Sequence, residues 1–181
     1  MAATDASSAL DFVRNTTESI RTQFGLIDPA ASDAQQRREL LVDDKLAPLF
    51  DFATASRLVL GKYWPQSSPE QRDLVERALR RRLVAAYSAA LAGAKEFSVG
   101  YVGARLRKKP QGALVRTRIE RPGRPRIEVH YRLRNRGDSW RVVDVVVAGV
   151  SLVVTQRKEF YDRIASVGLP ELTRQLSAEA R

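Results

Sequence analysis

The chain has 181 residues, no cysteine, and a formal net charge of +10 that comes mostly from arginine. Its length suffices for one domain with a sizeable core, and the absence of cysteine excludes disulfides and thiolate metal sites. No apolar run approaches the length of a membrane span. The charge is compatible with nucleic acid, an anionic membrane or an acidic protein as partner, and it does not choose among them.

Apolar residues at helical spacing predict that the N-terminal part of the chain is helical. Leu10, Val13, Ile20 and Phe24 predict a first helix that ends near Gly25. A second helix should carry Leu40 and Leu41 and end before Pro48, because proline lacks the backbone N–H that a helix interior needs. A third, short helix should end at Gly61, in the position of a helix cap.

The clearest helix start in the chain lies at Ser68, Pro69 and Gln71. These residues combine an N-cap, a first-turn proline and a capping-box partner. The helix that they begin has an apolar face that runs from Leu74 to Leu91. We expect this helix to be the main wall opposite the sheet.

From residue 97 onward the hydrophobic period changes from helical spacing to two. The pattern predicts four strands, at residues 97–107, 114–120, 127–134 and 140–154. The connectors are short and rich in Gly, Pro or Asn, so the strands should form an antiparallel meander. In the middle two strands apolar side chains alternate with arginine, which predicts one buried face and one wet, arginine-rich face.

The segment 140–154 is the longest apolar run, and we expect it to form one long strand that bends at Gly149. A helix should follow from Thr155. Two alternate sets could face the helices, either Val143, Val145 and Val147, or Val142, Asp144 and Val146. Asp144 is a polar residue inside an apolar run, so it should be hydrogen-bonded.

Two separated blocks of sequence point to a family. The first is Phe50, Asp51 and Phe52 followed by SRLVLGKYWPQSSPEQR at residues 56–72. The second is YRLR at residues 131–134 followed by WRVVDVVVAGVSLVVTQRKEF at residues 140–160. Taken together, in this order and at this separation, the blocks resemble the MlaC-type periplasmic phospholipid-binding proteins, also called the toluene-tolerance family.

The resemblance implies an α+β fold, in which a four-stranded, curved, NTF2-like antiparallel sheet is wrapped by about six helices around an apolar cavity. It implies a soluble, non-catalytic carrier that holds acyl chains in the Gram-negative periplasm and maintains outer-membrane lipid asymmetry. Such carriers shuttle lipid between an outer-membrane lipoprotein-porin complex and an inner-membrane ABC transporter that contains an MCE-domain hexamer. Phospholipid would then be the ligand, with no cofactor, no metal and no nucleic acid, and the protein is expected to be a monomer.

We expect residues 1–181 to form a single domain, with a helical part at 5–92, the sheet at 97–154 and C-terminal helices at 155–180. The N-terminus lacks the pattern of a secretory signal, so we expect that an exported form of the protein has already lost its signal segment. The candidate lipid-binding residues are the apolar and aromatic side chains of the inward faces. They are Phe50, Phe52, Leu58, Leu60, Tyr63, Trp64, Leu79, Leu83, Tyr87, Val115, Ile119, Val129, Tyr131, Leu133, Val143, Val145, Val147, Leu152, Phe160 and Ile164.

Other interpretations of these residues stay open at the level of sequence. The inward side chains could simply be packed core, since most apolar periodicity reflects packing. An NTF2-like enzyme for a small apolar substrate would need a buried acid-base pair, and Asp144 with Tyr131 or Tyr87 is the combination available. The single His130 lies on the arginine face, which excludes a His-dependent triad and a multi-His metal site. That face carries no interleaved aromatic residues, as nucleic-acid binding by stacking would require.

Overall fold

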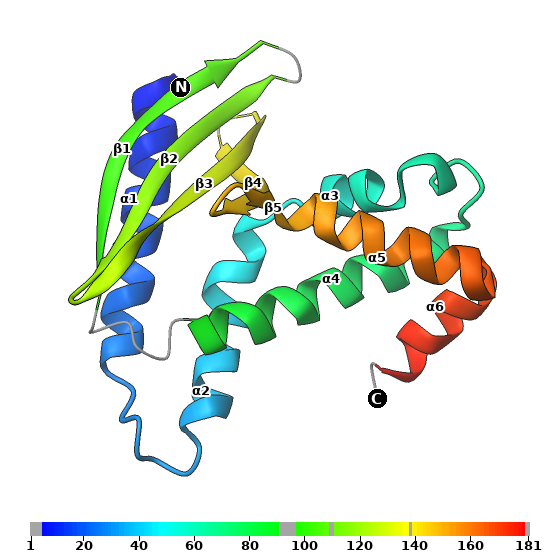
Figure 1. The fold of residues 1–181 in the computed structure, drawn as a ribbon, viewed down its shortest axis with the longest axis horizontal. Helices are drawn as coiled ribbons and strands as arrows, with labels where there is room; N and C mark the ends of the chain where they lie inside the picture. The colour runs from blue at the N-terminus through cyan, green and yellow to red at the C-terminus, as the bar shows by residue number, and fades with distance from the viewer. Residues whose placement is uncertain (1–4, 91–96, 109–110, 138, 180–181) are drawn as a thin grey trace.

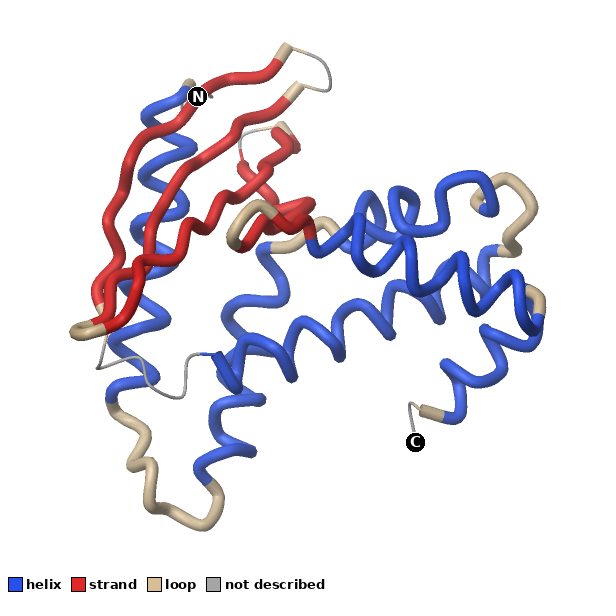
Figure 2. The backbone as a smooth tube through the Cα atoms, in the orientation of Figure 1, coloured by secondary structure: helices blue, strands red, loops and turns tan. Residues whose placement is uncertain are grey.

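The computed structural model of the protein describes residues 5–90, 97–108, 111–137 and 139–179. The fold is α+β, as the sequence predicts, with a curved antiparallel sheet on one side and most of the helices on the other (Figures 1 and 2). Helix α1 lies against one face of the sheet, and helices α3 to α6 gather beyond the β4–β5 end (Figure 1).

The N-terminal part is helical as predicted. Its elements are α1 (Ala6–Gly25), α2 (Ala34–Leu41), a π-helical turn (Val42–Leu46), a 3-10 turn (Ala47–Leu49), α3 (Phe52–Leu60), a 3-10 turn (Gly61–Tyr63) and α4 (Pro69–Ala90). The capping box at the start of α4 is confirmed, because the Ser68 N–H donates to Gln71 Oε1 at 2.9 Å and the Gln71 N–H donates to Ser68 Oγ at 3.2 Å. Leu91, which the sequence pattern adds to this helix, lies outside the described residues.

The sheet has five strands rather than the four that the pattern predicts. They are β1 (Ser98–Arg107), β2 (Gly112–Arg121), β3 (Arg124–Arg136), β4 (Ser139–Val147) and β5 (Val150–Ser151). Each strand pairs antiparallel with the next, in the order β1-β2-β3-β4-β5, so the predicted meander is confirmed.

The prediction of a single bent strand over residues 140–154 is wrong. β4 ends at Val147, and Ala148 and Gly149, with φ of 49° and 83°, form a two-residue hairpin loop to β5. Positive φ at both loop residues is typical of a type I′ turn, whose twist matches that of the flanking strands. Helix α5 (Leu152–Val167) then begins three residues earlier than predicted, because the Ser151 side chain accepts from the Val154 N–H as an N-cap. Helix α6 (Leu169–Ala178) follows.

A β-bulge in β4 determines which side chains of this strand face inward. Tyr131 pairs with Val145, Arg132 with Asp144, and Leu133 with Val142, so Val143 is an extra residue on β4. An extra residue shifts the alternation by one position. Val142 and Val145 therefore both join the buried face of the sheet, and neither predicted set faces the helices as a whole.

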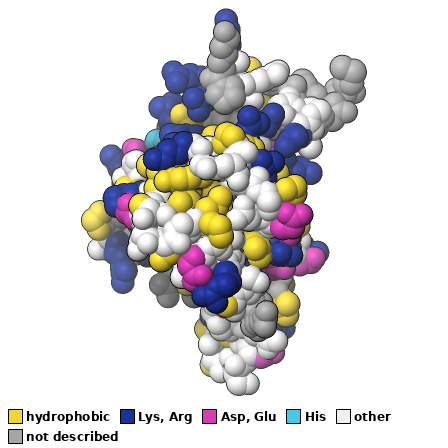
Figure 3. Space-filling model, turned by 90° about the vertical axis from the view of Figure 1, so that its right-hand side faces the viewer, with side chains coloured by type: hydrophobic (Ala, Val, Ile, Leu, Met, Phe, Trp, Pro, Cys, Tyr) yellow, Lys and Arg dark blue, Asp and Glu magenta, His cyan; other side chains and the backbone are white. Residues whose placement is uncertain are grey.

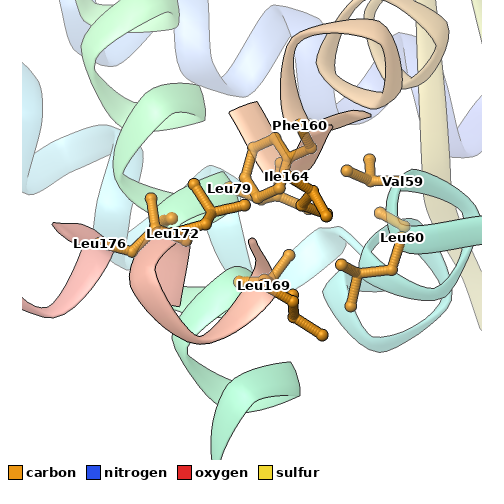
Figure 4. Close-up of a cluster of buried hydrophobic side chains, with 11 residues drawn as sticks. Val59, Leu60, Leu79, Phe160, Ile164, Leu169, Leu172 and Leu176 are labelled. Atoms are coloured by element: carbon orange, nitrogen blue, oxygen red, sulfur yellow. The ribbon is translucent and has the colours of Figure 1, made fainter. Parts of the chain in front are cut away.

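The buried side chains form three clusters. The helical cluster joins α3, α4, α5 and α6, and Figure 4 shows its members Val59, Leu60, Leu79, Phe160, Ile164, Leu169, Leu172 and Leu176. The sheet cluster joins α1 to the inner face of β2, β3 and β4, and the third cluster joins the end of α1, the π-helical turn and Phe97. The main wall opposite the sheet is therefore α1, and the expectation that this wall would be the Ser68 helix, α4, is wrong. Residues Leu83 and Tyr87 of α4 pack against the third cluster.

The hairpin loop gives a matched test of the fold. Ala148→Gly should raise the free energy of unfolding by up to about 1 kcal/mol, because glycine adopts positive φ without the penalty that a Cβ imposes. Gly149→Ala should lower it by about 1 kcal/mol for the same reason. A Cβ at Gly149 would meet no atom within 4 Å, so the loss would be purely conformational. Denaturant unfolding measures both values, and a loss of stability in Ala148→Gly would contradict the turn.

Candidate functional site

An apolar cavity of about 150 Å³ lies where α3, α4, β4 and the start of α5 meet. Aromatic and aliphatic side chains supply most of its wall, and the polar members lie at its edges. The lining residues are Phe50, Phe52, Ala55, Val59, Leu79, Arg82, Leu83, Ala86, Tyr87, Val143, Asp144, Val145, Leu152, Val153 and Gln156. The cavity thus lies between the helical cluster and the sheet.

A second, smaller apolar cavity of about 60 Å³ lies on the other side of Phe50 and Tyr87. It is bounded by α1, the turns before α3, and the inner face of the sheet, where Tyr131 and Val142 contribute. Phe50 and Tyr87 line both cavities, and their rings meet edge to face with centroids 6.2 Å apart. These two rings form the partition between the cavities.

Two tyrosines line the cavities, Tyr87 both of them and Tyr131 the smaller one. Burial raises the pKa of Tyr131 to about 12, and burial with the neighbouring Tyr131 hydroxyl raises the pKa of Tyr87 well above its ordinary value. The two tyrosine side chains are neighbours, and each influences the pKa of the other. Both side chains are therefore neutral at physiological pH.

Asp144 anchors the N-terminus of α5 to β4. Its Oδ1 accepts from the Val153 N–H at 3.0 Å, and its Oδ2 accepts from the Ser151 hydroxyl at 2.7 Å and from Arg132 at 2.8 Å. A carboxylate at a helix N-terminus is favoured by the helix dipole. The acid-base combination of Asp144 with Tyr87 or Tyr131 is therefore not assembled, because the hydrogen bonds of the carboxylate go to Arg132, Ser151 and Val153.

Asp51 fixes the position of the two phenylalanines on either side of it. Its backbone N–H donates to the carbonyl of Val142 at 2.8 Å, and its side chain caps α3 by accepting from the N–H and hydroxyl of Thr54. Arg136 donates to the same carboxylate at 3.0 Å. Burial alone would raise the pKa of Asp51, but the hydrogen bonds from Thr54 and Arg136 outweigh it and lower the pKa. Phe50 and Phe52 stack with their centroids 5.8 Å apart on this support.

The sequence matches a known protein family. The sequence model of the family described as MlaC protein matches residues 19–178. The chain belongs to the MlaC protein family. A solved structure from Ralstonia solanacearum, described as a phospholipid-binding protein in complex with a phospholipid, has the same fold. It superposes with a TM-score of 0.77 at 24% identity and covers 96% of each chain.

Nine of the residues predicted from the sequence of this MlaC-family chain line one of the two cavities. They are Phe50, Phe52, Leu79, Leu83, Tyr87, Val143, Val145 and Leu152 at the larger cavity and Tyr131 at the smaller. We call the junction of α3, α4, β4 and the start of α5, where the larger cavity lies, the seam. Three more predicted residues, Leu58, Trp64 and Leu133, line a wide groove on the outer side of this seam. Their role in binding stays a prediction.

The remaining predicted residues lie elsewhere. Leu60, Phe160 and Ile164 are buried in the helical cluster, and Tyr63 packs against that cluster. Val115, Val129 and Ile119 belong to the sheet cluster or pack against it, beneath α1. Val147 is 36% exposed at the end of β4. The structure therefore places these eight side chains in packed core or at the surface, away from the two cavities.

Several cavity residues are absent from the sequence-based set. Ala86 follows Leu79 and Leu83 on the same face of α4, and the helical spacing of that face could have identified it. Phe12, Leu46 and Leu49 line the smaller cavity because α1 covers the sheet, which the sequence pattern did not indicate. Arg82 closes one edge of the larger cavity, where it forms an ion pair with Glu159 at 2.7 Å and hydrogen-bonds to Gln156.

In the described ranges, no group of three or more His, Asp or Glu side chains is arranged to hold a metal ion. None of the helices in these ranges has the length and hydropathy needed to cross a membrane.

The lowered pKa of Asp51 predicts how stability depends on pH. A carboxylate whose pKa is lower in the folded state contributes stability above its unfolded pKa, and this contribution is lost as pH falls through the folded value. Asp51→Asn should therefore lower the free energy of unfolding by about 1 kcal/mol near neutral pH, and the difference from the unaltered protein should shrink below about pH 4.

Urea unfolding at a series of pH values measures this difference. Asp162→Asn is the matched control, because Asp162 pairs with Lys158 on the surface of α5 and both side chains are largely exposed. The control should change stability by less than about 0.5 kcal/mol at any pH. A cost at Asp51 that is constant from pH 7 to pH 3 would contradict the assignment.

Proposed function

We propose that this protein is a soluble periplasmic carrier that binds phospholipid acyl chains in the cavity between the helical cluster and the sheet. The observation that carries the proposal is the apolar wall formed by Phe50, Leu79, Leu83, Tyr87 and Val145. The charged residues of the lining, Arg82 and Asp144, are paired with Glu159 and Arg132. Membership of the MlaC family supports it, as does the shared fold with the Ralstonia solanacearum phospholipid-binding protein.

The energetics of lipid transfer favour such a wall. Moving an acyl chain out of a bilayer into water costs about 0.8 kcal/mol for each methylene, so a carrier must offer an equally dry surface. A charged group in that surface would lose its hydration without gaining a partner. Tyr87 and Tyr131 avoid this cost, because their raised pKa values keep both side chains neutral.

Acyl chains need more room than the two cavities now provide. An apolar cavity of about 150 Å³ holds a molecule of the size of benzene, and an acyl chain of a membrane lipid is several times larger. We therefore propose that a chain enters by displacing the rings of Phe50 and Tyr87. That movement would join the cavities of about 150 and 60 Å³ into one tunnel along the seam.

The wider role follows from the family. We propose that the protein carries phospholipid between an outer-membrane lipoprotein-porin complex and an inner-membrane MCE-domain ABC transporter, and so helps to maintain outer-membrane lipid asymmetry. It would act as a monomer and without catalysis. The separation of Asp144 from the tyrosine pair supports a binding role over an enzymatic one.

The direct test is the mass of the intact protein. When the protein is purified without detergent from a Gram-negative host, native mass spectrometry should detect a population that is heavier by one phospholipid. Solvent extraction and lipid analysis of the same sample should recover that phospholipid. A folded preparation that carries no phospholipid, and that acquires none from vesicles, would contradict the proposal.

A charge placed in the cavity wall should abolish binding. Leu83→Asp introduces a carboxylate that cannot be hydrated beside an acyl chain, so lipid occupancy should fall at least tenfold. Leu26→Asp is the matched control, since Leu26 is 79% exposed beyond the end of α1. The control should leave occupancy within twofold of the unaltered protein. Equal losses in both variants would contradict the position of the cavity.

A further inference from the structure

A wide basic groove of about 1130 Å³ lies on the outer side of the seam, between α3, the start of α5 and the arginine-bearing face of β3. Seven basic side chains line it, namely Arg57, Lys62, Arg107, Arg132, Arg134, Arg136 and Arg157. Cationic side chains are common on this protein, and at the helical end of the molecule they surround patches of hydrophobic side chains (Figure 3). Two features distinguish the groove. They are the hydrogen bonds that hold its arginines and the apolar cavity that lies beneath it.

The groove and the larger cavity share part of their walls. Val143, Asp144 and Val153 line both, so the floor of the groove at β4 and α5 is also a wall of the cavity. Leu58 and Val154 are 38% and 55% exposed and add apolar surface to the groove itself. At these shared residues the apolar cavity therefore lies directly beneath a basic surface.

Four arginines of the groove donate hydrogen bonds to protein groups, and their acceptors are of two kinds. Arg132 and Arg136 pair with the buried carboxylates of Asp144 and Asp51, at 2.8 and 3.0 Å, and these pairs balance their charge. Arg134 and Arg157 are instead held by neutral acceptors. Arg134 donates to the Thr54 hydroxyl at 2.8 Å, and Arg157 donates to the Leu58 carbonyl at 2.7 Å.

Among the described residues neither Arg134 nor Arg157 has a carboxylate partner, so the neutral acceptors hold two uncompensated charges at the groove. Thr54 and Leu58 are four residues apart on α3 and so lie on the same face of that helix. Arg134 reaches this face from β3, and Arg157 reaches it from α5. Each bond occupies one edge of a planar guanidinium and leaves further N–H groups to donate, an arrangement suited to binding phosphate oxygens from two sides.

We propose that Arg134 and Arg157 form a site for the phosphodiester of the phospholipid whose acyl chains occupy the cavity. This inference rests on the proposed function and adds to it a contact with the head group. A diacyl phosphodiester has an anionic end and an apolar end, which match the groove and the cavity on the two sides of Val143 and Val153. The exposed Leu58 and Val154 would lie beside the glycerol and the first methylenes.

The test compares two lipids that have the same acyl chains and differ in the phosphoglycerol head group. Binding of a pyrene-labelled phosphatidylglycerol and of a diacylglycerol with the same chains is measured by fluorescence in the unaltered protein and in the double variant Arg134→Gln/Arg157→Gln. Glutamine keeps an N–H donor near Thr54 and Leu58 while it removes the charge. The matched control is Arg105→Gln/Arg116→Gln, whose residues are on the arginine face of the sheet and do not line the groove.

The double variant should bind phosphatidylglycerol at least tenfold more weakly, and its affinity for diacylglycerol should stay within twofold. The control should bind both lipids like the unaltered protein. Equal weakening for both lipids, or no weakening for either, would overturn the head-group site and leave the carrier function standing.

Inorganic phosphate distinguishes a head group from a free anion. We expect millimolar phosphate to leave phosphatidylglycerol binding unchanged, because the site gains its occupancy from acyl chains held next to it. Competition by phosphate that disappears in the double variant would show a free-anion site and overturn the assignment. Failure of the unaltered protein to bind either lipid would contradict the proposed function itself, and with it this inference.

Discussion

The bulge in β4 places four consecutive side chains in four different surroundings. Val142 is buried with the sheet cluster, Val143 lies in the shared wall of cavity and groove, Asp144 bonds to the start of α5, and Val145 faces both the sheet cluster and the cavity. A regular strand would send Val142 and Asp144 to one face and Val143 and Val145 to the other. The cavity, the groove and the attachment of α5 all depend on this one extra residue.

The helical and sheet clusters are each well buried, and the apolar residues between them pack less completely. Phe160, Leu172 and Leu176 are fully buried within the helical cluster, and Val115 and Ala113 within the sheet cluster. Side chains that leave gaps lose dispersion contacts, so the seam is the weakest part of the interior. Opening the molecule there would cost the contacts of Phe50, Leu83 and Tyr87 and leave both clusters intact. This is the physical basis for proposing that lipid enters along the seam.

Regular periodicity in the sequence was sufficient to predict most of the architecture. The apolar stripe of α1, the capping box at Ser68, and the alternation of Val115 and Thr117 with Arg116 and Arg118 all correspond to observed elements. The Ala148–Gly149 turn was missed because valines continue on both sides of it, and a run of valine gives no signal for the end of a strand. The bulge at Val143 was missed because it is set by pairing with β3.

The cavity was harder to predict than the fold. Leu60, Phe160 and Ile164 follow the same helical spacing as Leu79 and Leu83, yet the first three lie in packed core away from the cavity. Leu79 belongs to the same cluster and also lines the cavity, and Leu83 lines it as well. Periodicity identifies the buried face of an element, and only the three-dimensional arrangement decides whether that face meets protein or a hollow. The smaller cavity depends on α1 lying over the sheet, which no local pattern predicts.

Photo-cross-linking with a phospholipid that carries a diazirine midway along one acyl chain would locate the bound chain within the fold. The protein is loaded from vesicles, irradiated and digested, and the labelled peptides are sequenced by mass spectrometry. If the seam holds the chain, labels should appear in the segments 50–59, 79–87 and 143–153. Labels confined to α6 or to the arginine face of the sheet would contradict binding along the seam. A folded protein that acquires no label would contradict it as well.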